Sequence, residues 1–188
     1  ASIDVKGKTV AEGDIARVLS VGSQHLARPD RAILHSLPIS YSLDEMTGIR
    51  DPRGMVGHRF GTDIHLMTAD FAVARNLMLA IERCHIEVDA MVAGSYAAGL
   101  SVLAEDEADL GAALIDMGAG TTTMAVFSGG RLVHGDGFAV GGQHVTMDIA
   151  RGLNTSMSVA ERIKAYYGSV LAGGSDERDM ITIPSVDD

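Results

Sequence analysis

Glycines divide residues 112–140 into three short segments of strand-like sequence. The first segment (AALIDM) ends at Gly118-Ala119-Gly120, the second is TTTMAVFS, and Gly129-Gly130 precedes the third. Apolar segments joined by short glycine-containing turns are typical of antiparallel strands. The pattern predicts a three-stranded β-meander in which Asp116 stands at the end of a buried strand and faces a glycine-rich turn.

The first turn of this meander has the residues of a phosphate-binding loop. Gly118 and Gly120 permit close approach of the backbone to an anion and allow N–H groups to converge on it. Asp116 cannot contact a phosphate directly, but it can hold Mg²⁺ through water, while Thr121 and Thr122 supply hydroxyls. A glycine-turned hairpin after an aspartate also occurs for purely structural reasons, so this pattern alone leaves both interpretations open.

Two features further along the chain favour the phosphate interpretation. Gly141-Gly142 opens a predicted helix, whose N-terminus favours an anion or allows a nucleotide to approach closely. Glu161 and Lys164 are one helical turn apart and can grip the hydroxyls of a sugar from one face, although such a spacing is also that of a surface ion pair. Ser158 and Glu161 have capping-box spacing at the start of this second helix, which is expected to end at Gly168.

The rest of the chain is expected to mix helices and strands. Hydrophobic periodicity and the turn residues predict the following further elements: strands at 1–6, 31–43, 58–67, 87–93 and 180–183, helices at 11–26, 70–84 and 95–103, and an acidic surface loop at 105–109. The order in the first part is therefore strand, helix, strand, strand.

Composition excludes several classes of function. The 188 residues include 25 acidic and 15 basic ones, for a formal net charge of −10, so sequence-independent binding of nucleic acid is not expected. Residues 90–104 form the longest uncharged run and are too short to cross a bilayer. Cys84 is the single cysteine; we expect it to be a small buried residue, and its solitary occurrence fits a reducing, intracellular environment.

The first residue bears on the extent of the chain. Because Ala1 is not an initiator methionine, the chain is expected to be an internal piece of a longer protein.

Two catalytic classes find no support in the sequence. The seven histidines and Cys84 do not have the spacing of metal ligands. No G-x-S-x-G sequence marks a serine nucleophile.

Three long stretches resemble a known family. They are HSLPISYSLDEMTGIRDPRGMVGHRFGTDIHLMT, LMLAIERCHIEVDAMVAGSYAAGLSVLAEDEADLGAALIDMGAGTTTMAVFSGGRLVH and GGQHVTMDIARGLNTSMSVAERIKAYYGS. The glycine-rich turn resembles the second phosphate motif of the actin, sugar-kinase and heat-shock-chaperone ATPases. The flanking residues resemble specifically the bacterial cell division family FtsA, over nearly the whole chain.

This resemblance implies a fold and a set of subdomains. The implied fold class is α/β, a partial actin-like (ribonuclease-H-like) fold with a strand-helix-strand-strand (SHS2-type) subdomain 1C. Residues 1–84 correspond to subdomain 1C and its connection to 1A, residues 85–110 to the last strand of 1A and the interdomain helix, and residues 111–188 to the first part of subdomain 2A. The resemblance also places the first phosphate loop, the adenosine-binding motif, subdomain 2B and a membrane-docking C-terminal helix outside these 188 residues.

The family's binding positions carry over residue by residue. Those that match its phosphate, helix-opening and ribose contacts are Asp116, Gly118, Gly120, Thr121, Gly142, Glu161 and Lys164. Two residues depart from the pattern of many relatives, because Ala119 replaces a third glycine and Thr123 replaces a carboxylate. The missing carboxylate makes efficient activation of water, and so hydrolysis, less expected than binding.

The resemblance implies a function in the division septum. It implies an ATP- and Mg²⁺-dependent protein that polymerises into actin-like filaments, and that links the FtsZ ring to the inner face of the cytoplasmic membrane at the division site. Subdomain 1C would meet later division proteins. The alternative is another actin-fold ATPase, chaperone-like or kinase-like, that turns over a substrate. A strand-helix-strand-strand module over residues 1–84 favours the first, because kinases and chaperones lack that insertion.

Overall fold

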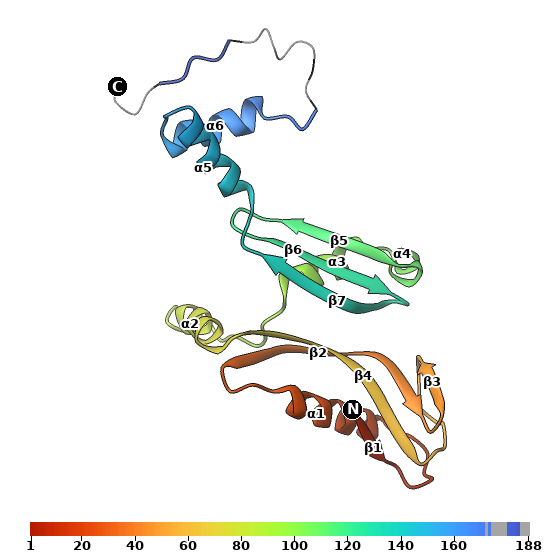
Figure 1. Cartoon of the computed structure of the whole chain (residues 1–188). Coiled ribbons are helices and arrows are strands. Elements are labelled where there is room, and N and C mark those ends of the chain that lie inside the picture. Colours follow the sequence, from red (N-terminus) through yellow and green to blue (C-terminus); the bar gives the residue numbers. More distant parts are fainter. Residues whose placement is uncertain (172, 174–179, 185–188) are drawn as a thin grey trace. The chain divides into compact units, whose positions relative to one another are not determined.

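The computed structural model describes residues 1–171, 173 and 180–184, and its chain divides into two compact units. The first unit comprises residues 1–115 and 124–136, and the second comprises residues 116–123 and 137–188. The predicted mixture of helices and strands is present in both (Figure 1).

The first unit begins with a four-stranded antiparallel sheet in the order β1-β4-β2-β3. Its strands are β1 (Ser2–Asp4), β2 (Arg31–Leu43), β3 (Met46–Ile49) and β4 (Arg59–Asp70). The long β2 and β4 pair from Arg31 opposite Asp70 to Leu43 opposite Phe60, with two register shifts. Strand β3 lies between the predicted strands 31–43 and 58–67, where no element is predicted from the sequence, and its Ile49 pairs with Tyr41.

Helix α1 (Glu12–Leu26) lies along one face of this sheet (Figure 1). The Asp14 carboxylate accepts a hydrogen bond from the N–H of Ala11 and so caps its first turn. Ile15 and Val18 of the helix pack into a core whose other buried members are Val5, Val10, Tyr41, Leu43 and Phe60. The strand-helix-strand-strand order predicted from the sequence is therefore a packed unit with its own core.

Three helices and most of a second sheet complete the first unit. The helices are α2 (Phe71–Glu82), α3 (Gly94–Val102) and α4 (Glu105–Leu110), and Asp70 caps α2 by accepting from the N–H of Val73. The second sheet is the predicted meander, in the order β5-β6-β7. Its strands are β5 (Ala112–Met117), β6 (Thr122–Ser128) and β7 (Arg131–Phe138).

Gly99 explains how the small-residue helix α3 packs against the meander. A Cβ atom at Gly99 would lie 2.3 Å from the Phe127 ring, closer than van der Waals contact allows. Phe127 is buried with Ala125 and Leu132, and Tyr96 of α3 stacks on its ring. The absent side chain at Gly99 therefore lets the helix reach the core of the sheet.

The second unit contains two further helices after β7. They are α5 (Gly142–Gly152) and α6 (Met157–Tyr167), which lie beside each other (Figure 1). Asn154, with φ at 47°, turns the chain between them. Across all described residues, none of the helices has the length and apolar character that crossing a bilayer requires.

Several local predictions are wrong, and each error has a physical reason. Residues 87–93 form no strand, because no other strand of the described chain lies alongside to complete a ladder. The acidic segment 105–109 begins a helix rather than a loop, because Glu107 caps it and carboxylates in a first turn interact favourably with the helix dipole. Residues 180–183 are not a strand, because no strand of the described chain pairs with them. Cys84 is exposed rather than buried, because α2 ends at Glu82 and Cys84 lies in the turn that follows.

Two further predictions are wrong near the candidate site. Helix α6 is capped by Ser156, which accepts from the N–H of Val159, and not by Ser158. Strand β5 is not buried: Ile115 and Met117 are exposed, because no element of the described chain covers these side chains on the faces of the sheet. Asp116 therefore stands at the end of an exposed strand.

Shortening a core residue of the first unit tests this arrangement. Leu43→Ala is expected to lower the free energy of unfolding by about 2–5 kcal/mol, because Leu43 is fully buried and its loss leaves a cavity. Urea denaturation followed by circular dichroism measures the change. The matched control is Leu77→Ala on α2, where the side chain is exposed and a change within about 0.5 kcal/mol is expected. Equal losses in the two variants would contradict the location of the core.

Candidate functional site

The glycine-rich turn joins β5 to β6 in the second unit. The N–H of Gly118 donates to the carbonyl of Thr121 (2.9 Å), which closes the turn. Asp116 and Thr121 are exposed, and the N–H groups of Ala119 and Gly120 have no hydrogen-bond partner among the described residues. The turn therefore presents a carboxylate, a hydroxyl and two unpaired N–H donors, which are groups that a hydrated Mg²⁺ and a phosphate require.

The turn is attached to the first residues of helix α5 by two backbone hydrogen bonds. The N–H of Gly142 donates to the carbonyl of Gly118 (3.0 Å), and the N–H of Gln143 donates to the carbonyl of Ala119 (2.8 Å). The Thr122 hydroxyl adds a third link by donating to the carbonyl of Val140 (2.7 Å). The turn and the start of the helix are therefore held together by three hydrogen bonds.

Gly141 makes this attachment sterically possible. A Cβ atom at Gly141 would lie 2.4 Å from the carbonyl oxygen of Gly118 and 2.6 Å from that of Ala119. At Gly142 the nearest atom to such a Cβ would be the ammonium nitrogen of Lys164, at 3.5 Å. Both glycines are evident in the sequence, but the close contact depends on Gly141, whereas the position that matches the family's helix-opening glycine is Gly142.

The attachment also changes what the α5 N-terminus can bind. Gly142 and Gln143 donate to the turn, and the N–H of His144 donates to the carbonyl of Gly141. Unpaired N–H groups are what make a helix N-terminus an anion site. Because these three donors are already used, the free donors of the turn itself are better placed than the helix to contact a phosphate.

The sugar-contact candidates of α6 meet α5 in a compact cluster. Lys164 Nζ lies 2.7 Å from Glu161 Oε2, and it also donates to Thr146 Oγ1 (2.8 Å) and to the carbonyl of Gly142 (3.1 Å). Thr146 is 2% exposed and hydrogen-bonds Glu161 Oε2 at 2.5 Å. The structure thus brings Gly142, Glu161 and Lys164 together, and adds Thr146, which the sequence argument missed because its role depends on how α5 packs against α6.

The Lys164 ammonium group lowers the pKa of its partner, the Glu161 carboxyl group. The hydrogen bond from Lys164, followed by that from Thr146, holds the pKa of Glu161 below its ordinary value of 4.5. Since the folded-state pKa is lower than that of the unfolded chain, the pair stabilises the fold above about pH 4.5. That contribution is lost as the pH falls through the folded-state pKa of Glu161.

The two departures from the family pattern have structural explanations. Ala119 has no positive φ, so its methyl group is compatible with the turn. Thr123 packs its methyl group towards β7, where a Cβ atom at Gly137 would lie 2.8 Å from it. Thr123 is half-buried and supplies no carboxylate.

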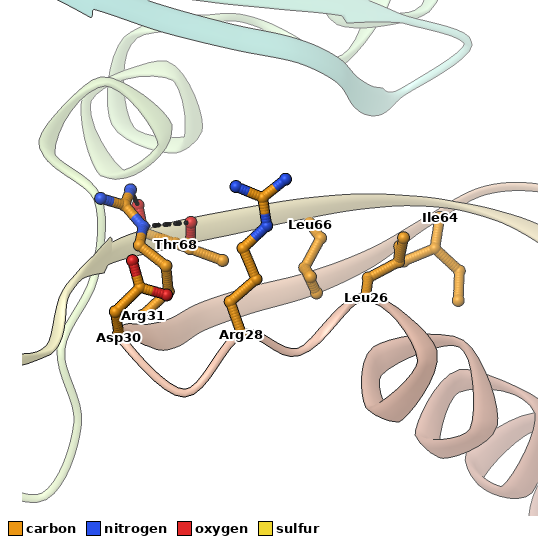
Figure 2. A pocket seen from close by; sticks show the side chains of 7 residues that line it. All are labelled: Leu26, Arg28, Asp30, Arg31, Ile64, Leu66 and Thr68. Carbon is orange, nitrogen blue, oxygen red and sulfur yellow. Dashed lines mark hydrogen bonds between the residues drawn. The ribbon is translucent and has the colours of Figure 1, made fainter.

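A separate hollow of about 600 Å³ lies in the first unit, between the end of α1 and β4 (Figure 2). Leu26, Ile64 and Leu66 form its apolar part, and Arg31 at one end donates to the hydroxyl and carbonyl of Thr68. None of its lining residues belongs to the predicted nucleotide site.

Two family profiles match separate parts of the chain. The profile described as "SHS2 domain inserted in FTSA" matches residues 1–68. The profile described as "Cell division protein FtsA" matches residues 113–188.

Curated proteins with this description are similar over almost the whole chain. The chain is 52% identical over 186 residues to "Cell division protein FtsA" of Agrobacterium fabrum, covering 99% of this chain and 42% of that protein. The corresponding Pseudomonas aeruginosa protein is 36% identical over 186 residues, with 99% and 45% covered. The Escherichia coli K12 protein is 34% identical over 184 residues, with 98% and 44% covered. The chain therefore spans less than half the length of these relatives.

A solved structure supports the fold. A chain in a "PilM-PilN type IV pilus biogenesis complex" superposes with a TM-score of 0.58 at 18% identity, over 89% of this chain and 47% of that one. At this identity the likeness establishes the fold alone. Together with the SHS2 match, it confirms the predicted fold class, a mixed α/β chain with part of an actin-like fold and an SHS2 unit.

Replacing Gly141 tests the attachment of the turn to the helix. Gly141→Ala is expected to lower the free energy of unfolding by about 1–3 kcal/mol, because the new methyl group meets two backbone carbonyls that cannot move independently. It should also accelerate amide exchange at Gly142 and Gln143, measured by NMR. Gly120→Ala is the matched control, since a Cβ atom there meets nothing within 4 Å. Unchanged exchange in the Gly141 variant would contradict the described contact.

Proposed function

This chain belongs to the FtsA family of cell division proteins, and from that premise we propose that it supplies one side of an ATP site in a filament-forming division protein. The observation that carries the proposal is the joining of the 118–120 turn, the start of α5 and the Glu161–Lys164 pair in one unit. In this proposal the turn contacts phosphate and the α6 pair lies near the sugar.

The proposed roles follow from the donors and acceptors that each residue offers. The N–H groups of the turn between Gly118 and Gly120, with the Thr121 hydroxyl, bind phosphate oxygens. Asp116 holds Mg²⁺ through water, which matches the preference of this ion for one or two carboxylates with the remaining positions given to water and phosphate. When bound, Mg²⁺ neutralises phosphate charge. Thr122 is a positioning residue, because its hydroxyl proton is committed to Val140.

The site favours binding over turnover. Activation of an attacking water needs a general base, and Thr123 stands where many relatives have a carboxylate. We therefore propose that ATP binding acts as a switch for assembly, and that rapid hydrolysis is not the function of this site. This distinguishes the proposal from its alternative, a chaperone-like or kinase-like ATPase.

The proposed setting is the division septum. In it the whole protein binds FtsZ, associates with itself into filaments and reaches the cytoplasmic face of the membrane through a helix outside these residues. The SHS2 unit, residues 1–68 of the proposed subdomain 1C, meets later division proteins. The proposed remaining boundaries are 85–110 for the last strand of 1A with the interdomain helix, and 111–188 for the first part of 2A.

Titration with Mg-ATP tests the nucleotide site. Calorimetry on the 188-residue chain is expected to show binding weaker than micromolar, because the chain spans less than half of its relatives and so holds a part of their site. Chemical-shift changes at high nucleotide concentration should concentrate in residues 116–122, 141–146 and 161–164. Removal of Mg²⁺ with EDTA is the control and should reduce them. Micromolar binding would contradict the partial site, and shifts confined to the first unit would contradict its location.

A chimera tests the division function. The corresponding segment of the Agrobacterium fabrum relative is replaced by these residues, which match it at 52% identity over 186 positions. The chimera is expected to sediment with FtsZ on lipid vesicles in the presence of ATP. The unaltered relative is the positive control and sets the amount of sedimentation that counts as full activity. The same chimera with Gly141→Ala is expected to sediment less. A chimera that hydrolyses ATP rapidly with a small substrate and never sediments would favour the catalytic alternative.

A further inference from the structure

Thr146 is the buried member of the cluster that joins α5 to α6. Its hydroxyl receives a hydrogen bond from Lys164 Nζ (2.8 Å) and lies 2.5 Å from Glu161 Oε2. The side chain of Glu161 is 55% exposed and that of Lys164 is 27% exposed, whereas Thr146 is 2% exposed. Of the three, Thr146 is therefore the residue whose position is fixed by packing.

Lys164 has no free donor in this arrangement. An ammonium group has three N–H donors and no acceptor. Lys164 Nζ has three acceptors around it, which are Glu161 Oε2 (2.7 Å), Thr146 Oγ1 (2.8 Å) and the carbonyl of Gly142 (3.1 Å). All its protons are therefore committed, and Lys164 cannot donate to a ligand without giving up one of these contacts.

The single hydroxyl proton of Thr146 goes to Glu161. Two acceptors compete for this proton, Glu161 Oε2 at 2.5 Å and the carbonyl of Gly142 at 3.1 Å. A hydrogen bond from a hydroxyl to a carboxylate is shorter and stronger than one to a neutral carbonyl, so the proton is donated to the carboxylate. Glu161 Oε2 consequently receives hydrogen bonds from both Thr146 and Lys164.

The other carboxylate oxygen, Glu161 Oε1, is left without a hydrogen bond within the described residues. We propose that Thr146 is a positioning residue which, with Lys164, fixes Glu161 so that Oε1 alone meets a ligand hydroxyl. The cluster then selects a ligand that donates hydrogen bonds, such as the vicinal diol of a ribose. The identity of that ligand rests on the proposed nucleotide function, but the roles of the three side chains do not.

The threonine methyl group has a part in this positioning. A β-branched residue in a helix is restricted at χ1, and the threonine hydroxyl can also bond the carbonyl four residues earlier, which here is Gly142. The Thr146 hydroxyl is therefore confined to a narrow range of positions, and from these it can reach both Glu161 Oε2 and the carbonyl of Gly142. Serine keeps the hydroxyl with more rotational freedom, and valine keeps the shape without the hydroxyl.

The test measures the Glu161 carboxylate directly. Its ¹³C chemical shift is followed by NMR against pH in the 188-residue chain, in Thr146→Val and in Thr146→Ser. Thr146→Val is expected to raise the pKa of Glu161 towards its ordinary value of 4.5, because a donor to the ionised form is lost. Thr146→Ser is expected to leave it close to that of the unaltered chain. An unchanged titration in a folded Thr146→Val variant would overturn the proposal.

A second measurement decides the matter if Thr146→Val does not fold. A buried hydroxyl proton held by a carboxylate exchanges slowly with water, so the unaltered chain is expected to give an observable Thr146 hydroxyl resonance with a cross-peak to Glu161. Its absence at low temperature, where the amides of α5 and α6 remain protected, would overturn the proposal.

Binding of nucleotide is tested in a separate NMR measurement. Addition of Mg-ATP is expected to shift the Glu161 carboxylate resonance in the unaltered chain and to shift it less in Thr146→Val. If the titration and the hydroxyl resonance behave as expected while Mg-ATP produces no shift, the positioning role stands and the proposed nucleotide function fails. If Mg-ATP instead shifts the Lys164 ammonium resonance and leaves Glu161 unmoved, the division of roles is wrong.

Discussion

The candidate site depends on one close backbone contact, between the 118–120 turn and the start of helix α5. Carbonyl groups of the turn approach Gly141 so closely that no side chain fits there, and they accept hydrogen bonds from the next two residues of the helix. This contact fixes the direction of α5 relative to the turn, both of which belong to the second unit. Because α6 packs on α5, the position of the Glu161–Lys164 pair relative to the turn follows from it.

The local elements were predictable where one stretch of sequence carries its own signal. The strand-helix-strand-strand order, the meander and helices α5 and α6 follow from periodicity and from glycine turns, which act over a few residues. Residues 87–93 have a strand-like composition but no neighbouring strand among the described residues, and sequence periodicity does not reveal whether such a partner exists. The helix at Glu105–Leu110 was missed because its cap, Glu107, reads as one more solvated charge.

The site was predictable in its residue types and less so in its geometry. Glycines, a carboxylate and threonines in one turn, with a Glu and a Lys one helical turn apart, identify the candidate groups. Gly141 and Thr146 could not be singled out in this way, because their importance arises from contacts between α5 and other elements. The sequence also left open whether the α5 N-terminus binds an anion or only allows a nucleotide to approach closely. The choice depends on the partners of its N–H groups, which the sequence does not show.

The peptide group between Gly142 and Gln143 joins the two ends of the candidate site. Its N–H, that of Gln143, donates to the carbonyl of Ala119 in the turn, and its carbonyl, that of Gly142, accepts from Lys164. A ligand that draws Lys164 away from this arrangement removes a charged donor from the Gly142 carbonyl, and the same peptide group carries a contact with the turn. A hydrogen bond at one end of a planar amide is polarised by the bond at its other end. In the proposed nucleotide site, interactions at the sugar side and at the phosphate side would therefore be coupled through a single backbone group. Such coupling suits the proposed role as a switch that responds to a whole bound nucleotide better than it suits rapid turnover.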